Sequence, residues 1–229
     1  MTQDEIIEIA KKSGINKNKV HIIFANSDDK VEISNKIVEQ YHGYVASRKT
    51  VGRCLKYLID YNNQYIGTFW LGSGFKPTPK PILNYFNLGQ KQFDLIFNEV
   101  ADNKRFCLID SIPNLGSIVL SGIRKRARAD WYNIYGDDLK AIITTIGGDR
   151  KGSVYLADNW MVIGETSGLP SDRKSVSMKW NNANEINERY EKPTGENKKV
   201  ILITQSLGNK IVPTKPKITH QITTQLELI

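Results

Sequence analysis

Apolar and polar positions follow two periods along the chain, and each change of period marks a new element. Stretches with apolar residues three and four positions apart are typical of helices, and they occupy residues 2–13, 28–41, 90–100 and 113–132. Short apolar runs are typical of buried strands, and they occupy residues 20–24, 51–60, 65–71, 105–109 and 139–146. This order predicts an α/β protein with a mixed central sheet flanked by helices.

Local signals sharpen several of these boundaries. Gly14 marks the end of the first helix, and Asp28 or Asp29 can cap the second. The asparagines of Tyr61-Asn62-Asn63-Gln64 are suited to a hairpin turn between two strands. After residue 146 the sequence predicts a glycine-rich turn, a short helix that carries Tyr155, and a further apolar strand.

The domain organisation follows from the absence of a linker before about residue 170. Residues 1–170 are therefore interpreted as one domain, and residues 171–229 as a C-terminal extension that packs on it. Strand-like runs occupy residues 174–180 and 199–207 of the extension, on either side of a polar segment. The tail from Gly208 is left open between an edge strand and a disordered end.

Composition argues against a membrane or secreted protein. No apolar run approaches the roughly 20 residues that a membrane span needs, and the acidic start Met1–Glu5 lacks the order of a secretion signal. Cys54 and Cys107 lie inside apolar runs without metal-ligand spacing, which indicates reduced core residues. We therefore expect a cytoplasmic protein without a membrane partner, in the host's cytoplasm if a phage encodes it.

The net charge of +8 and the pI near 9.3 favour a polyanionic partner such as nucleic acid. Arg124, Lys125 and Arg128 crowd one predicted helix, together with Arg126. The cluster predicts a face that binds DNA phosphates. The alternative, an ordinary solvated helix face, stays open on sequence alone.

Several short motifs carry a family resemblance over about residues 41–168. In order, they are Tyr41-His42-Gly43-Tyr44, Phe69–Ser73, Asn103–Ile109, Pro113–Ser117 and Tyr155–Gly164. They resemble the DruA family of anti-phage defence and transposon-associated proteins. The same order is similar to the Mom family of phage DNA-modification proteins, which have an acetyltransferase-like fold and modify the exocyclic amine of adenine. The resemblance thus implies an acetyltransferase-like (GNAT-like) fold.

The Mom-like resemblance implies that a few polar residues gather at one catalytic site. Those residues are His42, Arg105, Asp149 and Tyr155. A histidine that titrates near neutral pH can act as a base or a metal ligand, and a guanidinium suits a phosphate or carboxylate. In acetyltransferase-like folds, a tyrosine at the place of Tyr155 donates a proton to the departing thiolate. Either Tyr41 or Tyr44 corresponds to the family's tyrosine beside the histidine, and both are candidates for stacking on a DNA base.

The cofactor is less sharply indicated. Asn114, Gly116 and Ser117 open a predicted helix, whose N-terminus can hold an anion from a cofactor or from DNA. Their loop has one glycine and a proline, unlike the glycine-rich loops that cradle a pyrophosphate. Candidates are acetyl-coenzyme A, another acyl donor, or iron, with His42 and Asp149 as the metal ligands.

These observations lead to one main functional hypothesis and two alternatives. The main one is a DNA-modifying group transferase that acts on the exocyclic amine of a base, adenine by resemblance, in phage or mobile-element DNA. The first alternative is a non-catalytic DNA-binding component of an anti-phage defence or transposition system. The second is an acetyltransferase acting on small amines or proteins. The oligomeric state, monomer or homodimer, is left open.

Overall fold

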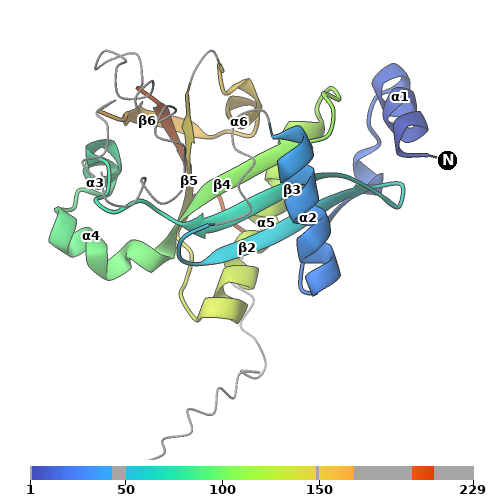
Figure 1. Cartoon of the computed structure of the whole chain (residues 1–229). Coiled ribbons are helices and arrows are strands. Elements are labelled where there is room, and N and C mark those ends of the chain that lie inside the picture. Colours follow the sequence, from blue (N-terminus) through green and yellow to red (C-terminus); the bar gives the residue numbers. More distant parts are fainter. Residues whose placement is uncertain (1, 43–49, 148–149, 168–197, 209–229) are drawn as a thin grey trace, which may run out of the picture.

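The structure is a computed structural model, which describes residues 2–42, 50–147, 150–167 and 198–208. Its α-helices are α1 (Gln3–Ser13), α2 (Asp28–Tyr41), α3 (Lys80–Phe86), α4 (Gln90–Ile96), α5 (Leu115–Tyr135) and α6 (Ser153–Ala157). Its strands are β1 (Val20–Phe24), β2 (Cys54–Tyr61), β3 (Gln64–Ser73), β4 (Val100–Leu108), β5 (Ala141–Ile146), β6 (Met161–Glu165) and β7 (Val200–Thr204). Figure 1 shows these elements as one mixed sheet flanked by helices, so the predicted α/β class is confirmed.

Short-range signals explain where several elements begin and turn. Thr2 and Glu5 form a reciprocal capping box at the start of α1. The start of α2 differs from the prediction, because Ser27 occupies the N-cap and the two aspartates lie in the first turn. There they still complement the positive end of the helix dipole. Asn62 and Asn63 have φ of 52° and 61°, as a tight hairpin between β2 and β3 requires.

The strand order of the seven-stranded sheet is β1-β2-β3-β4-β5-β7-β6. β4 and β5 are parallel and are joined through α5, whereas the other neighbours are antiparallel. β7 comes from the predicted C-terminal extension and pairs between β5 and β6, so the extension contributes to the same sheet. The predicted strand at residues 174–180 and the tail beyond residue 208 lie outside the described residues.

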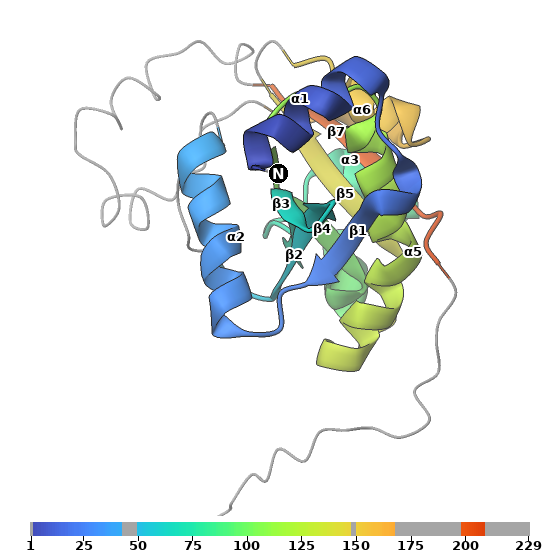
Figure 2. The ribbon, with the colours of Figure 1, turned by 90° about the vertical axis from the view of Figure 1, so that its right-hand side faces the viewer.

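Figure 2 shows helices on both faces of the sheet, and alternate residues of each strand point to opposite faces. Ala101, Ile142 and Leu202 belong to the core beneath α1 and α5. Their neighbours Val100, Ile143 and Ile201 belong to the core beneath α3 and α4, on the opposite face. α2 covers β2, β3 and β4 on that second face.

Two elements differ from the pattern-based expectation. β4 begins at Val100, five residues before the predicted start, because the polar run Asp102–Lys104 interrupts its apolar pattern while pairing with β3 continues. α3 was not predicted, since it lies in a proline-rich connector. Pro81 occupies the first turn of α3, where a helix tolerates proline. Within the described segments, no helix is both long enough and apolar enough to cross a membrane.

Candidate active site

A cavity opens where the two parallel strands β4 and β5 separate. They pair only from Val100 with Ala141 to Asp102 with Ile143, after which β5 continues beside β7. The cavity has a volume of about 450 Å³. It is lined by residues 103–108 of β4, residues 144–146 of β5, residues 150–155, and Tyr41 and His42 at the end of α2. In Figure 1, α6 is drawn above β4 and β5.

A β-bulge in β4 directs two cations to the same face of the sheet. Arg105 pairs with Trp70 and Asn103 with Leu71, so Lys104 is the extra residue. Arg105 lies over the ring of Trp70, and Lys104 lies against Gly72. Trp70 and Gly72 are two positions apart on β3 and share a face. The bulge thus places two adjacent basic side chains on one face of the sheet, although the Lys104 ammonium lies 4.4 Å from the centroid of the Phe75 ring.

The cavity lining is strongly cationic. It includes Lys104, Arg105, Arg150 and Lys151, and no Asp or Glu belongs to its described part. Lys104 is partly neutralised, because its Nζ lies 3.0 Å from Oδ2 of the buried Asp102. Burial raises the pKa of Asp102 to about 6, although Lys104 and Arg105 oppose the shift. Such a lining favours an anionic ligand with several charges, a phosphate group above all.

His42 is available as a base in this setting. It is the C-cap of α2 and is half-buried, and its backbone N–H donates to the carbonyl of Val38. Burial lowers the pKa of its imidazole below the ordinary value of 6.5, and the charges of Arg105 and Arg150 lower it further. The lowered pKa favours the neutral form of the imidazole, which is the form that can accept a proton.

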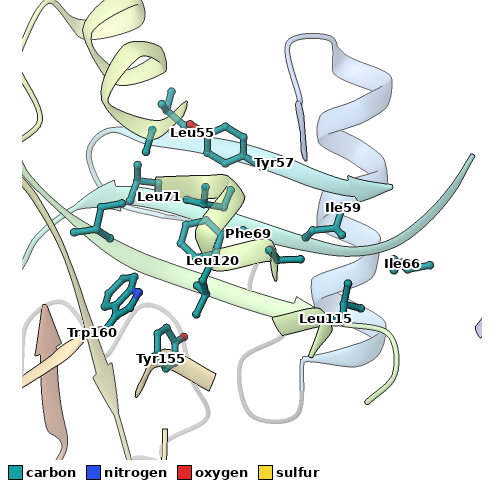
Figure 3. Close-up of a cluster of buried hydrophobic side chains, with 14 of the residues drawn as sticks. Leu55, Tyr57, Ile59, Ile66, Phe69, Leu71, Leu115, Leu120, Tyr155 and Trp160 are labelled. Carbon is teal, nitrogen blue, oxygen red and sulfur yellow. The ribbon is translucent and has the colours of Figure 1, made fainter. Parts of the chain in front are cut away.

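Tyr155 holds a phenol at the floor of the cavity. The side chain is 9% exposed, and Nδ2 of Asn103 donates to its hydroxyl oxygen at 2.7 Å. Its ring lies 5.1 Å from the ring of Trp160, beside which Figure 3 shows it, and 6.3 Å from the ring of Phe106. Because the oxygen accepts from Asn103, the phenol's own proton points away from the Asn103 amide.

Asn103 and the cations other than Arg105 were not among the site residues that the sequence indicated. Asn103 also lies 3.4 Å from the hydroxyl of Thr144 on β5, so it bridges the two strands where they part. For Asn103 and Lys104, the sequence signals were the resemblance motif Asn103–Ile109 and the polar interruption Asp102–Lys104 within a buried strand. Polar residues at such a position are typical of a functional site rather than of a core.

The predicted cofactor residues lie in or beside the first turn of α5, not in the cavity lining. Asn114 is the N-cap, with φ of 65°, and Ser117 donates its hydroxyl to the Asn114 carbonyl. Gly116 is buried, and a Cβ added there would lie 2.3 Å from Cγ2 of Val154 on α6. Close packing between α5 and α6 therefore explains this glycine. The first turn of α5 carries no charged side chain, whereas the cavity lining includes several basic residues.

The predicted DNA-binding residues of α5 are largely paired within the chain. Arg124 donates twice to Asp158, and Arg128 donates twice to Asp138. Lys125 is exposed. Two of the three charges are thus neutralised by carboxylates, which favours a structural role for them. DNA binding by this helix stays a prediction.

Other candidates are placed as follows. Tyr41 lines the cavity and is 44% exposed, whereas Tyr44 and Asp149 lie outside the described residues. Within the described ranges, no three His, Cys, Asp or Glu residues are grouped as a metal site requires.

The two cysteines are buried to different degrees. Cys107 is buried, which raises the pKa of its thiol to about 11, and Cys54 is partly buried. Both cysteines are free thiols, as the sequence predicts.

Several solved structures similar to this one are acetyltransferases. The apo ribosomal L7/L12 alpha-N-protein acetyltransferase RimL has a TM-score of 0.45 and 14% identity, over 83% of this chain and 96% of that one. AAC(6')-Ib in complex with Parmomycin and AcetylCoA has a TM-score of 0.46 and 10% identity, over 82% of this chain and 93% of that one. A GNAT family acetyltransferase from Elizabethkingia anophelis with acetyl-CoA bound has a TM-score of 0.42 and 14% identity, over 82% and 99%.

No family model matches the sequence, and no curated protein matches it. The solved structures belong to the fold class that the sequence predicts. What the cavity can do chemically depends on its own side chains.

Proposed function

We propose that this protein is a group transferase that moves an acyl-type group from a phosphate-bearing donor to an amine. One observation carries the proposal. A single cavity, where β4 and β5 part, combines several cations with His42, whose pKa is lowered, and a buried Tyr155 phenol. Cations bind a donor's phosphates, a neutral imidazole accepts a proton, and a phenol donates one. Group transfer to an amine needs these three capacities together.

Each side chain has one task in this scheme. Arg105 and Arg150 hold the phosphates of the donor, which supplies an activated acyl group when bound. His42 accepts the proton that the amine nitrogen loses as its new bond forms. Tyr155 delivers a proton from its hydroxyl to the leaving atom, and Asn103 keeps that hydroxyl in place. The proton count balances, because His42 takes up the proton that the amine loses and Tyr155 gives one to the leaving atom.

The proposed acceptor is the exocyclic amine of a DNA base, adenine by resemblance. The net charge of +8 supports a polyanionic substrate, and the cavity cations provide positive charge beside the reacting groups. A base reaches such a cavity only from a single strand or after flipping out of a duplex. Tyr41, half-exposed at the cavity, is the aromatic side chain on which it would stack.

Donor binding gives the first test of this proposal. Acetyl-coenzyme A at a hundredfold excess over its dissociation constant should stabilise the chain by about 2.7 kcal/mol, measured by thermal unfolding. Replacing Arg150 and Lys151 with alanine should reduce this shift, because both line the cavity. The matched control replaces Lys17 and Lys19, which are exposed on the short helix before β1.

DNA exposed to the protein and the donor would be analysed for modified nucleosides by mass spectrometry. A modified base that disappears in the Arg150/Lys151 variant is the expected result. Stabilisation by neither acetyl-coenzyme A nor other acyl carriers, together with unmodified DNA, would contradict the transferase. DNA binding without either effect would favour the non-catalytic component of a defence or transposition system.

The pKa of His42 gives a second prediction. Titration of its imidazole by NMR should give a pKa below 6.5, and Arg105→Gln should move that pKa upward because one of the charges that lower it is removed. His42→Gln identifies the signal, and Lys17→Gln serves as the charge control. Catalytic efficiency should fall on the acid side of neutrality, at the same pH as this titration.

The lowered pKa of His42 also makes the free energy of unfolding depend on pH. The pKa of His42 is lower in the folded chain than in the unfolded chain, so protonation favours unfolding. The stabilising contribution is complete above pH 6.5 and is lost as the pH falls through the folded pKa. An imidazole that titrates at or above 6.5 in the folded protein would remove the basis for its role as a base.

A further inference from the structure

Arg124 lies in the middle of α5, and each of its three guanidinium nitrogens donates a hydrogen bond to another residue of the chain. Nε and Nη2 each donate to a different oxygen of Asp158, both at 2.7 Å. Nη1 donates to the carbonyl and the hydroxyl of Ser206, just after β7. The two charged side chains are 14% and 4% exposed. This arginine therefore joins α5 to the end of α6 and to the segment that follows β7.

Asp158 is directly connected to the surroundings of Tyr155. It is the C-cap of α6, and its backbone N–H donates to the Tyr155 carbonyl at 3.0 Å. The backbone N–H of Trp160 donates to the same carbonyl at 3.0 Å. The indole of Trp160 donates to Oδ2 of Asp158 at 3.0 Å and packs against the Tyr155 ring. Asp158 therefore contacts the backbone of Tyr155 through its own N–H, and the ring neighbour of Tyr155 through the carboxylate that Arg124 binds.

α6 depends on such outside contacts because it has only five residues. A helix of this length is not stable by itself in water. Its first turn is held by Val154 against Gly116, and its last residue is followed by Asp158 on Arg124. Both contacts are made by α5, so α5 determines where α6 and its tyrosine lie beside the cavity.

We propose that Arg124 and Asp158 are positioning residues for Tyr155. Their ion pair holds the C-terminal end of α6 against α5 and so keeps the Tyr155 hydroxyl within reach of Asn103 at the cavity floor. The importance of this for catalysis rests on the proposed function, because that function gives Tyr155 its role as a proton donor. The geometric effect on Tyr155 can be measured without any activity.

The chain offers a matched control on the same helix. Arg128 binds Asp138 in the same two-point manner, with Nε to Oδ1 at 2.7 Å and Nη2 to Oδ2 at 2.9 Å. This pair is more exposed, at 32% and 31%, and Asp138 follows the end of α5 rather than α6. Arg128→Gln therefore removes an equal charge and an equal type of pair without loosening α6.

The experiment compares Arg124→Gln with Arg128→Gln in the full chain, with tyrosine labelled at Cζ and observed by NMR. Tyr155→Phe identifies the Tyr155 signal by its disappearance. We expect Arg124→Gln to displace or broaden that signal, and Arg128→Gln to leave it in place. Arg124→Lys keeps the charge but not the two-point geometry, and should give an intermediate displacement.

If Arg124→Gln fails to fold, Asp158→Asn tests the same ion pair from its other side. The new amide oxygen can still accept from the Trp160 indole, so this variant removes the charge with less disturbance. A folded Arg124→Gln or Asp158→Asn variant with the Tyr155 signal unmoved would overturn the proposal. Where transfer is measurable, kcat should fall in both variants with KM for the donor nearly unchanged. Failure of the proposed function would instead appear as no transfer in the wild type, whatever the NMR signal shows.

Discussion

Replacing Tyr155 with phenylalanine should lower the rate of group transfer about 10²- to 10⁴-fold, the range that a positioned acid or base contributes. The substitution removes the hydroxyl and keeps the ring that packs against Trp160 and Phe106. Donor binding should persist, because the cations that hold the phosphates are unchanged. The measurement is kcat for base modification, with donor binding followed by thermal unfolding.

The free energy of unfolding of the Tyr155→Phe protein should change only modestly. The partly buried Asn103 loses an acceptor at 2.7 Å but keeps the Thr144 hydroxyl at 3.4 Å, so we expect the low end of the about 1–3 kcal/mol that an unsatisfied donor costs. Tyr85→Phe is the matched control, since Tyr85 packs beside Phe86 on α3, away from the cavity lining. A Tyr155→Phe protein that transfers at the wild-type rate would show that another group protonates the leaving atom.

Replacing Gly116 with alanine should destabilise the fold and reduce transfer, because the new Cβ would lie 2.3 Å from Cγ2 of Val154. Overpacking of this kind costs about 1–3 kcal/mol, whereas the higher helix propensity of alanine returns up to about 1 kcal/mol. We therefore expect a net loss of stability in chemical denaturation. Displacement of α6, which carries Tyr155, explains the expected loss of transfer.

A second substitution separates packing from cofactor binding. Val154→Ala makes room for the added methyl group, so the Gly116→Ala/Val154→Ala protein should be more stable than the sum of the single effects predicts. If Gly116 instead bound the donor directly, the double variant would remain inactive. Ser117→Ala, which changes the same turn without adding bulk, should then also weaken the donor-induced stabilisation.

The elements of this protein follow largely from local signals in its sequence. The sequence predicts the hairpin at Asn62 and Asn63 because asparagine tolerates a positive φ, and a tight turn needs this conformation at only two adjacent residues. The boundaries of α1 and β1 likewise agree with caps and short apolar runs. The family resemblance also selected His42, Arg105 and Tyr155, which line one cavity in the structure. Their chemical roles stay predictions.

The tertiary structure decided how those elements use their side chains. The sequence predicted a DNA face from Arg124 and Arg128, but their partners Asp158 and Asp138 lie 34 and 10 positions further along the chain. Helical periodicity reports on neighbours three and four positions away, so it carries no information about such partners.

The cavity, too, depends on contacts between residues that are distant in the sequence. The sequence predicts a buried strand only at residues 105–109, and the fold continues β4 through the polar run Asp102–Lys104 that precedes it. The fold places a bulge beside β3 and parts β4 from β5 after Asp102, so that Asn103 meets Tyr155 from 52 positions away. Local preferences set the type of each element because they act between neighbouring residues. Bulges, ion pairs and cavities depend on contacts between distant residues, which exist only once the sheet has formed.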